Sequence, residues 1–301
     1  VKVRYLVVHD LEVANMSSNG INCDDGGELN NPDATRYVVF RGLEIHDIGG
    51  SGNEDCLKLS GLDDYFVLDS SFTRCGGSSK GSGVDHVGCH DGLIHGNRFE
   101  QMSGNAVQSK GGSTDIEIRA NTLINAGARG INMGGGTGTK FFRPAISTSA
   151  PNAEARRIRV LSNLIVGSEA AVAFVGCVDC VVANNTIVDP GKWVMRILQE
   201  SKTNATYTFE EVKNGKFINN IIYFDASKVA TTVNVGSNTQ AGTFTFANNL
   251  WYAHDAPGSS APTLPVTETA GIVGQDPKLD TTQGYRTQSA SPAFGAGKGP
   301  S

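Results

Sequence analysis

The sequence predicts an all-β protein, a right-handed parallel β-helix solenoid of about nine or ten rungs with a C-terminal capping tail. Three observations support this fold class. The chain has 37 glycines, many asparagines and only 18% charged residues, which is typical of β-structure with many tight turns. A short motif recurs along the chain. The residues around it alternate apolar and polar with a period of two, which excludes a helical solenoid.

The recurring motif is a tripeptide, usually Asn, then any residue, then a large apolar residue, as in Asn97-Arg98-Phe99 and Asn121-Thr122-Leu123. Its spacing varies from 22 to 42 residues. The shortest spacing is therefore the bare repeat, and the remainder is inserted loop, which stacked repeats tolerate. Including weaker versions upstream, the units begin at positions 11, 43, 70, 97, 121, 163, 185, 220 and 249.

Each unit predicts short strands. One alternating strand precedes the Asn, as in "IEIRAN" and "IRVLSN", and another follows a Gly-rich turn, as in "GINC", "CLKL" and "AVQSK". A coil of three short strands per turn fits this pattern, with rungs about 4.8 Å apart. We expect the recurring Asn to adopt left-handed geometry at a bend and to hydrogen-bond through its amide to the rungs above and below.

The Asn-x-apolar units, together with "NEDCLKLSG", "SGVDHVG" and "QSKGGSTDIEIRAN", resemble the pectate-lyase-like superfamily and its bacterial parallel β-helix repeat proteins. The resemblance covers roughly residues 1–255 and implies the fold; the superfamily includes lyases, glycosidases and epimerases, as well as proteins with no known activity. Residues 256–301 resemble the C-terminal closing segment of such proteins. We expect this segment to pack on the coil within a single domain, because a bare last rung exposes strand edges and core.

Charge and cysteine content exclude some functions. The formal charge of -5 gives no basic stripe for nucleic acid, and no apolar run reaches the roughly 18 to 20 residues that span a bilayer. We expect a monomer that is secreted or periplasmic, with a signal peptide upstream of Val1.

Six cysteines are too sparse for a disulfide framework. For Cys177 and Cys180, buried thiols or a local disulfide are favoured over a metal or redox pair.

Aligning the units on their second strand groups side chains into rows. One row points inward: Ile21, Leu57, Val84, Val107, Ile131 and Val172. The residues that follow these point outward: Asn22, Lys58, Asp85, Gln108, Asn132 and Ala173. A second outward row lies two residues further along: Asp24, Ser60, Val87, Lys110, Gly134 and Val175. The alignment predicts a polar face that ends at Ala173 and Val175.

This polar face is typical of a saccharide site. Three insertions, 24–36, 134–155 and 199–212, are expected to border it, because long loops beside a rigid coil commonly build a cleft. In the longest, "KFFRP" offers Phe141 and Phe142 to stack on sugar rings and Arg143 to pair with a carboxylate. The alternative is that this loop covers exposed core.

Cleaving a uronate polymer by β-elimination requires a base and a group that offsets the carboxylate charge. Some lyases of the superfamily use a lysine on one rung and an arginine on the next, and Lys110 and Arg129 resemble that pair, although the repeat places Arg129 in the turn before its strand. Asp85 lies between Lys110 and Lys58. The candidate catalytic residues are therefore Lys110, Arg129 and Asp85. The candidate substrate-binding residues are Lys58, Gln108, Asn132, Phe141, Phe142 and Arg143.

Calcium is a candidate cofactor, because hard carboxylate oxygens gather on the first rungs. The candidate ligands are Asp24, Asp25, Glu54 and Asp55; the same residues are also common in tight turns.

Three functions follow from the sequence. The first is a lyase acting on an acidic polysaccharide of the alginate or pectate type. The second is a glycoside hydrolase that pairs Asp85 with Asp55 or Asp24. The third is a carbohydrate-binding or surface-attachment solenoid without activity.

Overall fold

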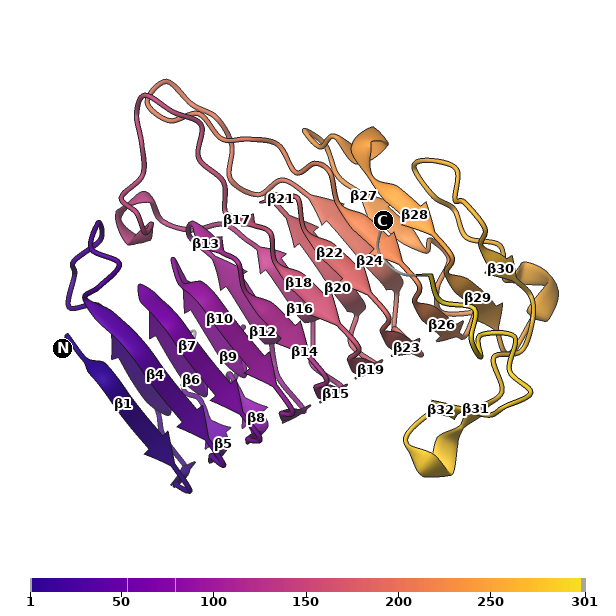
Figure 1. The fold of residues 1–301 in the computed structure, drawn as a ribbon, viewed down its shortest axis with the longest axis horizontal. Helices are drawn as coiled ribbons and strands as arrows, with labels where there is room; N and C mark the ends of the chain where they lie inside the picture. The colour runs from indigo at the N-terminus through magenta and orange to yellow at the C-terminus, as the bar shows by residue number, and fades with distance from the viewer. Residues whose placement is uncertain (1, 53, 79, 299–301) are drawn as a thin grey trace.

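The computed structural model describes residues 2–52, 54–78 and 80–298. The chain winds into an elongated coil whose strands stack into three long sheets (Figure 1), and every strand pair in these sheets is parallel. Apart from four single 3₁₀ turns, the described residues form no helix, so none is long and apolar enough to cross a membrane. The 3₁₀ turns are η1 (Thr139–Phe141), η2 (Ala241–Thr243), η3 (Pro257–Ser259) and η4 (Thr281–Gln283).

Each turn of the coil contributes a strand to each sheet. Sheet 1 follows the order β1 (Arg4–His9), β4 (Thr35–Arg41), β7 (Leu62–Leu68), β10 (His90–His95), β14 (Glu117–Arg119), β18 (Arg159–Leu161), β22 (Val181–Ala183), β25 (Lys216–Ile218) and β28 (Thr245–Ala247), with β13 (Ser113–Thr114), β17 (Ala155–Arg156) and β21 (Cys177–Val178) beside it. Sheet 2 follows β2 (Glu12–Ala14), β5 (Glu44–Ile48), β8 (Ser71–Cys75), β11 (Arg98–Glu100), β15 (Thr122–Ile124), β19 (Leu164–Val166), β23 (Thr186–Val188), β26 (Ile221–Phe224), β29 (Leu250–Ala253) and β30 (Ile272–Val273).

Sheet 3 carries the polar face that the sequence predicts. Its strands are β3 (Ile21–Asp24), β6 (Leu57–Ser60), β9 (Val84–Val87), β12 (Asn105–Lys110), β16 (Arg129–Gly134), β20 (Ala170–Val175), β24 (Trp193–Leu198) and β27 (Val233–Val235). Outside the coil, β31 (Leu279–Asp280) and β32 (Arg286–Thr287) form a two-stranded antiparallel pair.

The core consists of side chains stacked from rung to rung. In sheet 2 one inward stack runs from Ile45 through Phe72 and Phe99 to Trp251, all without exposed surface. Neighbours in such a stack are one rung apart, so the rings of Phe72 and Phe99 stack with centroids 4.9 Å apart. Full burial of an apolar side chain contributes about 1.5–3 kcal/mol, and its repetition on every rung stabilises the coil.

The recurring asparagines form a continuous ladder inside the bend between sheets 1 and 2. The Asn97 side chain donates to Oδ1 of Asn121 at 3.0 Å, and Asn121 donates to Asn163 in the same way. The expectation that these asparagines adopt left-handed geometry is wrong. The residue before each one has the positive φ, for example Ala120 at 55° and Ser162 at 55°. The ladder Asn follows this left-handed residue, and its buried amide bonds the next rung.

The C-terminal segment closes the ladder. Glu268 accepts hydrogen bonds from the backbone nitrogen of Asn249 (3.1 Å) and its side-chain Nδ2 (2.7 Å), and a further one from Nε1 of Trp251 (2.8 Å). Two disulfides join Cys56 to Cys75 and Cys177 to Cys180. Of the two alternatives favoured for Cys177 and Cys180, buried thiols or a local disulfide, the structure shows the disulfide.

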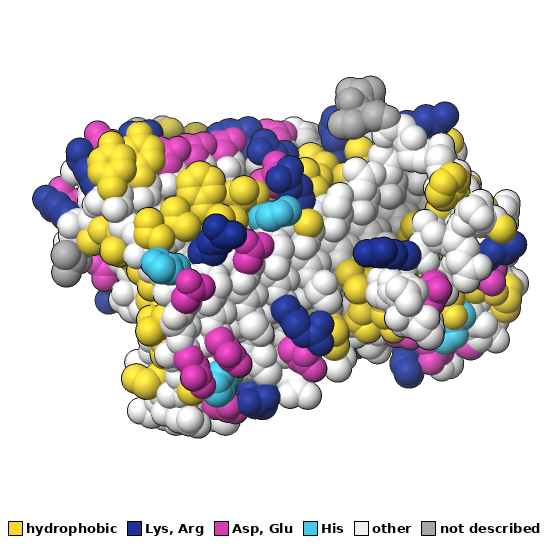
Figure 2. Space-filling view, turned by 60° about the horizontal axis from the view of Figure 1, so that its bottom comes forward, with side chains coloured by type: hydrophobic (Ala, Val, Ile, Leu, Met, Phe, Trp, Pro, Cys, Tyr) yellow, Lys and Arg dark blue, Asp and Glu magenta, His cyan; other side chains and the backbone are white. Residues whose placement is uncertain are grey.

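Two faces of the coil differ in chemistry. In Figure 2 apolar side chains gather at the upper left, over the N-terminal strands of sheet 1. They include Tyr5, which is 77% exposed and stacks on Tyr37, together with Val7 and Phe66. Because these side chains belong to sheet 1, they take no part in the polar face of sheet 3.

Candidate functional site

The outward rows of sheet 3 have the register that the repeat predicts. Lys58 pairs with Asp85, Asp85 with Gln108, and Gln108 with Asn132. The inward row is confirmed by the same pairings, from Ile21 with Leu57 to Ile131 with Val172. Because successive strands are parallel and in register, side chains far apart in sequence become neighbours about 4.8 Å apart.

Two lysines meet on one buried carboxylate. Lys58 Nζ contacts Oδ2 of Asp85 and lies 3.1 Å from Oδ2 of Asp55. Lys110 Nζ lies 3.4 Å from the same Oδ2 of Asp85, and at the same distance from Oε1 of Gln108. Asp85 has no exposed surface, and its other oxygen, Oδ1, has no hydrogen-bond partner among the residues that the structure describes. The cluster of Asp55, Lys58, Asp85 and Lys110 is therefore held together mainly by charge.

Burial and charge shift the protonation of this cluster. Burial and the nearby Asp85 raise the pKa of Asp55 to about 6. Burial alone would lower the pKa of Lys58, but Asp85 and Asp55 raise it above its ordinary value. Lys58 therefore keeps its positive charge across the physiological range and cannot act as a base there.

A groove of about 600 Å³ lies over the cluster. Lys58 and Lys110 face it from the sheet, while Gly26 and Gly136–Gly138 belong to two of the insertions predicted to border the site. Phe141, 49% exposed, also lines it. The third insertion packs against the second through Phe209 and Phe142, whose ring centroids are 5.9 Å apart. Figure 1 shows these two long loops running together above the coil.

Glu154 joins the groove wall to the strand that carries Lys110. Its buried carboxylate accepts a hydrogen bond from the backbone nitrogen of Gly111, next to Lys110, at 2.9 Å. It also accepts from the backbone nitrogen (2.9 Å) and hydroxyl (2.7 Å) of Thr137, and from the hydroxyl of Ser201. One side chain thus fixes the end of β12 and both long loops. Glu154 was not among the predicted site residues, because no repeat or motif marks it in the sequence.

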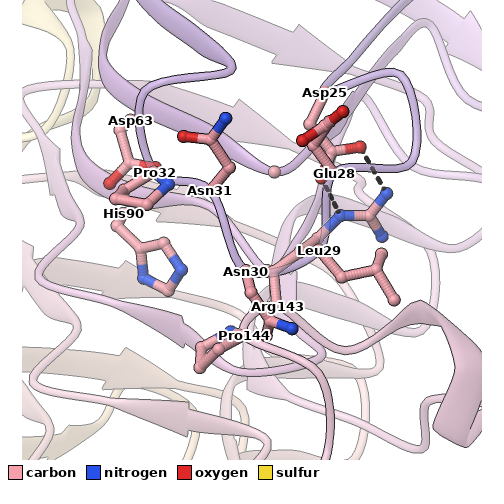
Figure 3. A pocket seen from close by; sticks show the side chains of 12 residues that line it. Asp25, Glu28, Leu29, Asn30, Asn31, Pro32, Asp63, His90, Arg143 and Pro144 are labelled. Carbon is pink, nitrogen blue, oxygen red and sulfur yellow. Dashed lines mark hydrogen bonds and ion pairs between the residues drawn. The ribbon is translucent and has the colours of Figure 1, made fainter.

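A smaller cavity of about 200 Å³ lies beside the groove (Figure 3). Arg143 separates the two, because its guanidinium makes two hydrogen bonds to the Asp25 carboxylate at 2.8 and 2.9 Å. Burial would raise the pKa of Asp25, but Arg143 and the Gly27 amide hold it below its ordinary value. On the other side of this cavity lies Asp63, whose pKa burial and the nearby Asp91 raise to about 7.

Two of the predicted site residues, Arg129 and Phe142, lie in other surroundings than the sequence predicted. Arg129 does not lie in a turn but begins β16, where its guanidinium donates to Asn132 at 3.0 Å and to Glu200 at 2.8 Å. Phe142 is only 2% exposed and packs on Phe209, so it does not reach the groove. Its adjacent residue Phe141 does. The sequence left two roles open for this loop, covering core and lining the site. Phe142 has the first role and Phe141 the second.

Comparisons with known proteins agree with this architecture. No protein-family model matches the chain, and no curated protein matches its sequence. Among solved structures, the alginate lyase from Paenibacillus sp. str. FPU-7 superposes with a TM-score of 0.53 at 16% identity, over 87% of this chain and 87% of that one. The tailspike protein of E. coli bacteriophage HK620, as a double mutant, has a TM-score of 0.48 at 13% identity, over 80% of this chain and 48% of that one. PfbA, a surface adhesin of Streptococcus pneumoniae, has 0.45 at 12% identity, over 81% and 75%.

The protein is a right-handed parallel β-helix. The predicted fold class is confirmed. At these identities the likeness concerns the fold, so the chemistry of this β-helix has to be argued from its own residues.

The four residues proposed as calcium ligands have separate contacts in the β-helix. Asp25 is bound by Arg143, and Asp55 by Lys58 and the Ser82 nitrogen. Asp24 accepts from the Gly26 nitrogen, and Glu54 from that of Gly52. Among residues 2–52, 54–78 and 80–298, no group of three or more His, Cys, Asp or Glu side chains is placed to hold a metal ion. This donor set does not fit calcium, which takes six to eight oxygens.

The alignment predicted that the polar face ends at Ala173, and this is wrong. Ala173 pairs with Arg196 on β24, and Arg196 pairs with Asn234 on β27. The polar row thus resumes after a single rung. The alternating segment "WVMRIL" carries the same signal as the aligned strands, so extending the alignment by one unit would have found Arg196.

Proposed function

We propose that this β-helix is a polysaccharide lyase, which binds a uronate-containing polysaccharide in the groove over sheet 3 and cleaves it by β-elimination. The observation that carries the proposal is the meeting of Lys58 and Lys110, which line the groove, on Asp85, which is buried beneath them. It places one lysine that stays charged beside a second lysine that faces the groove.

In the proposed reaction Lys110 acts as the base. Its unprotonated Nζ takes the proton from the carbon next to the uronate carboxylate. The electron pair left on that carbon forms a carbon–carbon double bond as the glycosidic C–O bond breaks, and the departing oxygen takes up a proton from solvent water. Lys58, held charged by Asp85 and Asp55, offsets the negative charge that develops on the carboxylate.

The same contacts disfavour hydrolysis by paired carboxylates. A glycosidase needs two carboxyl groups that flank the sugar bond. Asp85 and Asp55 are 0% and 1% exposed, and both bind the Lys58 ammonium. Neither carboxylate lines the groove. The fold shared with an alginate lyase fits the proposal, and an acidic polymer outside the cell fits the expected secreted or periplasmic location.

Incubation with alginate, pectate and glycosaminoglycans tests the proposal. Elimination leaves an unsaturated sugar, so ultraviolet absorbance should rise with at least one of these polymers. New reducing ends without that absorbance would instead establish hydrolysis. Binding without either product would establish a carbohydrate-binding protein and rule out the lyase.

A further inference from the structure

Arg196 is an oriented cation on the same face as the groove. It lies on β24 in the outward row that contains Lys58, Asp85 and Gln108. Its guanidinium lies 4.2 Å from the ring centroid of Trp193, and its Nε donates to Oδ1 of Asn234 at 3.0 Å. These two contacts fix the plane of the guanidinium and use only one of its five N–H groups.

Arg196 differs from the neighbouring cations in its ion pairing. Among the described residues, no carboxylate lies within ion-pair distance of it, whereas Arg129 is paired with Glu200 and Lys192 with Glu169. Arg129 and Arg196 are two rungs apart in the register, with the short Ala170 and Ala173 on the strand between them. Burial and the charge of Arg129 lower the pKa of Arg196, while Glu169 and Glu200 act in the opposite direction without reversing the shift. The two guanidiniums repel each other, and an anion placed between them would relieve that repulsion.

We infer that Arg129 and Arg196 form a second binding position for a carboxylate of the polysaccharide, on β16 and β24. This inference rests on the proposed function. Arg129 lies one rung from Lys110 and Arg196 three rungs, or about 14 Å along the coil, so only a chain of several sugars reaches both Lys110 and Arg196. The planar guanidinium of an arginine can donate two parallel hydrogen bonds to a carboxylate, so two arginines suit this group better than a lysine would. The second position would therefore hold the polymer in register while Lys110 acts on one bond.

Binding of a uronate trisaccharide and of a decasaccharide, measured by calorimetry, tests the inference. The variants are Arg196→Ala and Arg196→Gln, of which the second keeps the hydrogen bond to Asn234 without the charge. Both should weaken decasaccharide binding by at least about tenfold, the equivalent of one charge-assisted contact. Neither should change binding of the trisaccharide at the lysines. Arg196→Lys should restore only part of the lost affinity, because it returns the charge without the two parallel hydrogen bonds.

Arg159→Ala is the matched control, since it removes the same charge from sheet 1, where Arg159 pairs with Glu117 at 3.1 Å. Decasaccharide binding that is equal in wild type and both Arg196 variants would overturn the inference and leave the lyase untouched. A wild-type protein that binds neither oligosaccharide would overturn the proposed function itself. An equal loss of decasaccharide affinity in Arg159→Ala would show that the net charge of the protein causes the effect. It would also overturn the inference.

Discussion

Lys110 Nζ lies 3.4 Å from Oδ2 of Asp85, a carboxylate with no surface exposed to solvent. The same oxygen contacts Lys58, and within residues 2–52, 54–78 and 80–298 the other oxygen has no hydrogen-bond partner. The two lysines are therefore coupled through one buried charge. A change at any of the three residues alters the electrostatics of the other two.

Lys110→Ala should reduce the rate of elimination by about 10²- to 10⁴-fold, the usual contribution of a positioned base. Lys110→Arg is the sharper variant, because arginine keeps the positive charge beside Asp85 but does not lose its proton at ordinary pH. It should bind polymer and stay inactive. Initial rates from ultraviolet absorbance check this, with the exposed Lys228→Ala as control. A Lys110→Arg variant with wild-type rates would contradict the role of Lys110 as base.

Asp85→Asn should destabilise the protein by about 3 kcal/mol, because removing one partner of a buried ion pair leaves uncompensated charge. The loss is at the lower end of the usual range, since Lys58 keeps Asp55 at 3.1 Å and Lys110 keeps Gln108 at 3.4 Å. Urea unfolding at neutral pH measures it. An unchanged unfolding midpoint would show that the lysines do not depend on Asp85.

Glu154→Gln should lower kcat/KM by about tenfold with most of the loss in kcat, because Gly111 donates to one carboxylate oxygen and the Thr137 nitrogen to the other, and an amide nitrogen in place of either oxygen cannot accept. Ser201→Ala is the control: it removes a different partner of Glu154 without touching the end of β12. If Glu154 served only the stability of the loops, both variants would lower thermal stability and neither would change kcat. Steady-state kinetics beside thermal unfolding separates these outcomes.

Asp63→Asn should stabilise the protein above pH 7 and have little effect near pH 4. The unfolded chain releases the Asp63 proton near pH 4, whereas the folded chain keeps it until about pH 7. Between these values, rising pH favours the unfolded state. After allowance for solvent screening, the gain at pH 8 is about 1 kcal/mol. Unfolding free energies of both proteins across this range check the sign, and a stabilisation that grows toward low pH would contradict it.

The repeat carried most of the fold prediction. Asn97, Asn121 and Asn163 recur because each amide bonds the next rung, so a motif visible in the sequence corresponds to a physical contact. The alternation around them then gave the register of Lys58, Asp85 and Gln108 correctly. The predicted polar face ended one rung too early, at Ala173. It therefore did not include Arg196, although the strand that carries Arg196 alternates like the others.

The repeat pattern could not predict the contacts between loops. Arg143 binds Asp25 across 118 positions, and Arg129 binds Glu200 across 71. Glu154 reaches Gly111 and Ser201 from a third place in the chain. No repeat links these residues, because each depends on the path of an irregular insertion.

The sequence by itself therefore determined the coil, the rung register and the face on which Lys58, Asp85 and Lys110 lie, since these follow from a local pattern repeated along the chain. Only the tertiary structure decided how the side chains on that face interact. It buried Asp85 between two lysines, removed Phe142 from the groove and left Arg196 without a carboxylate partner in the described part of the chain. Such outcomes depend on burial and on loops that meet in space, which the repeat does not encode.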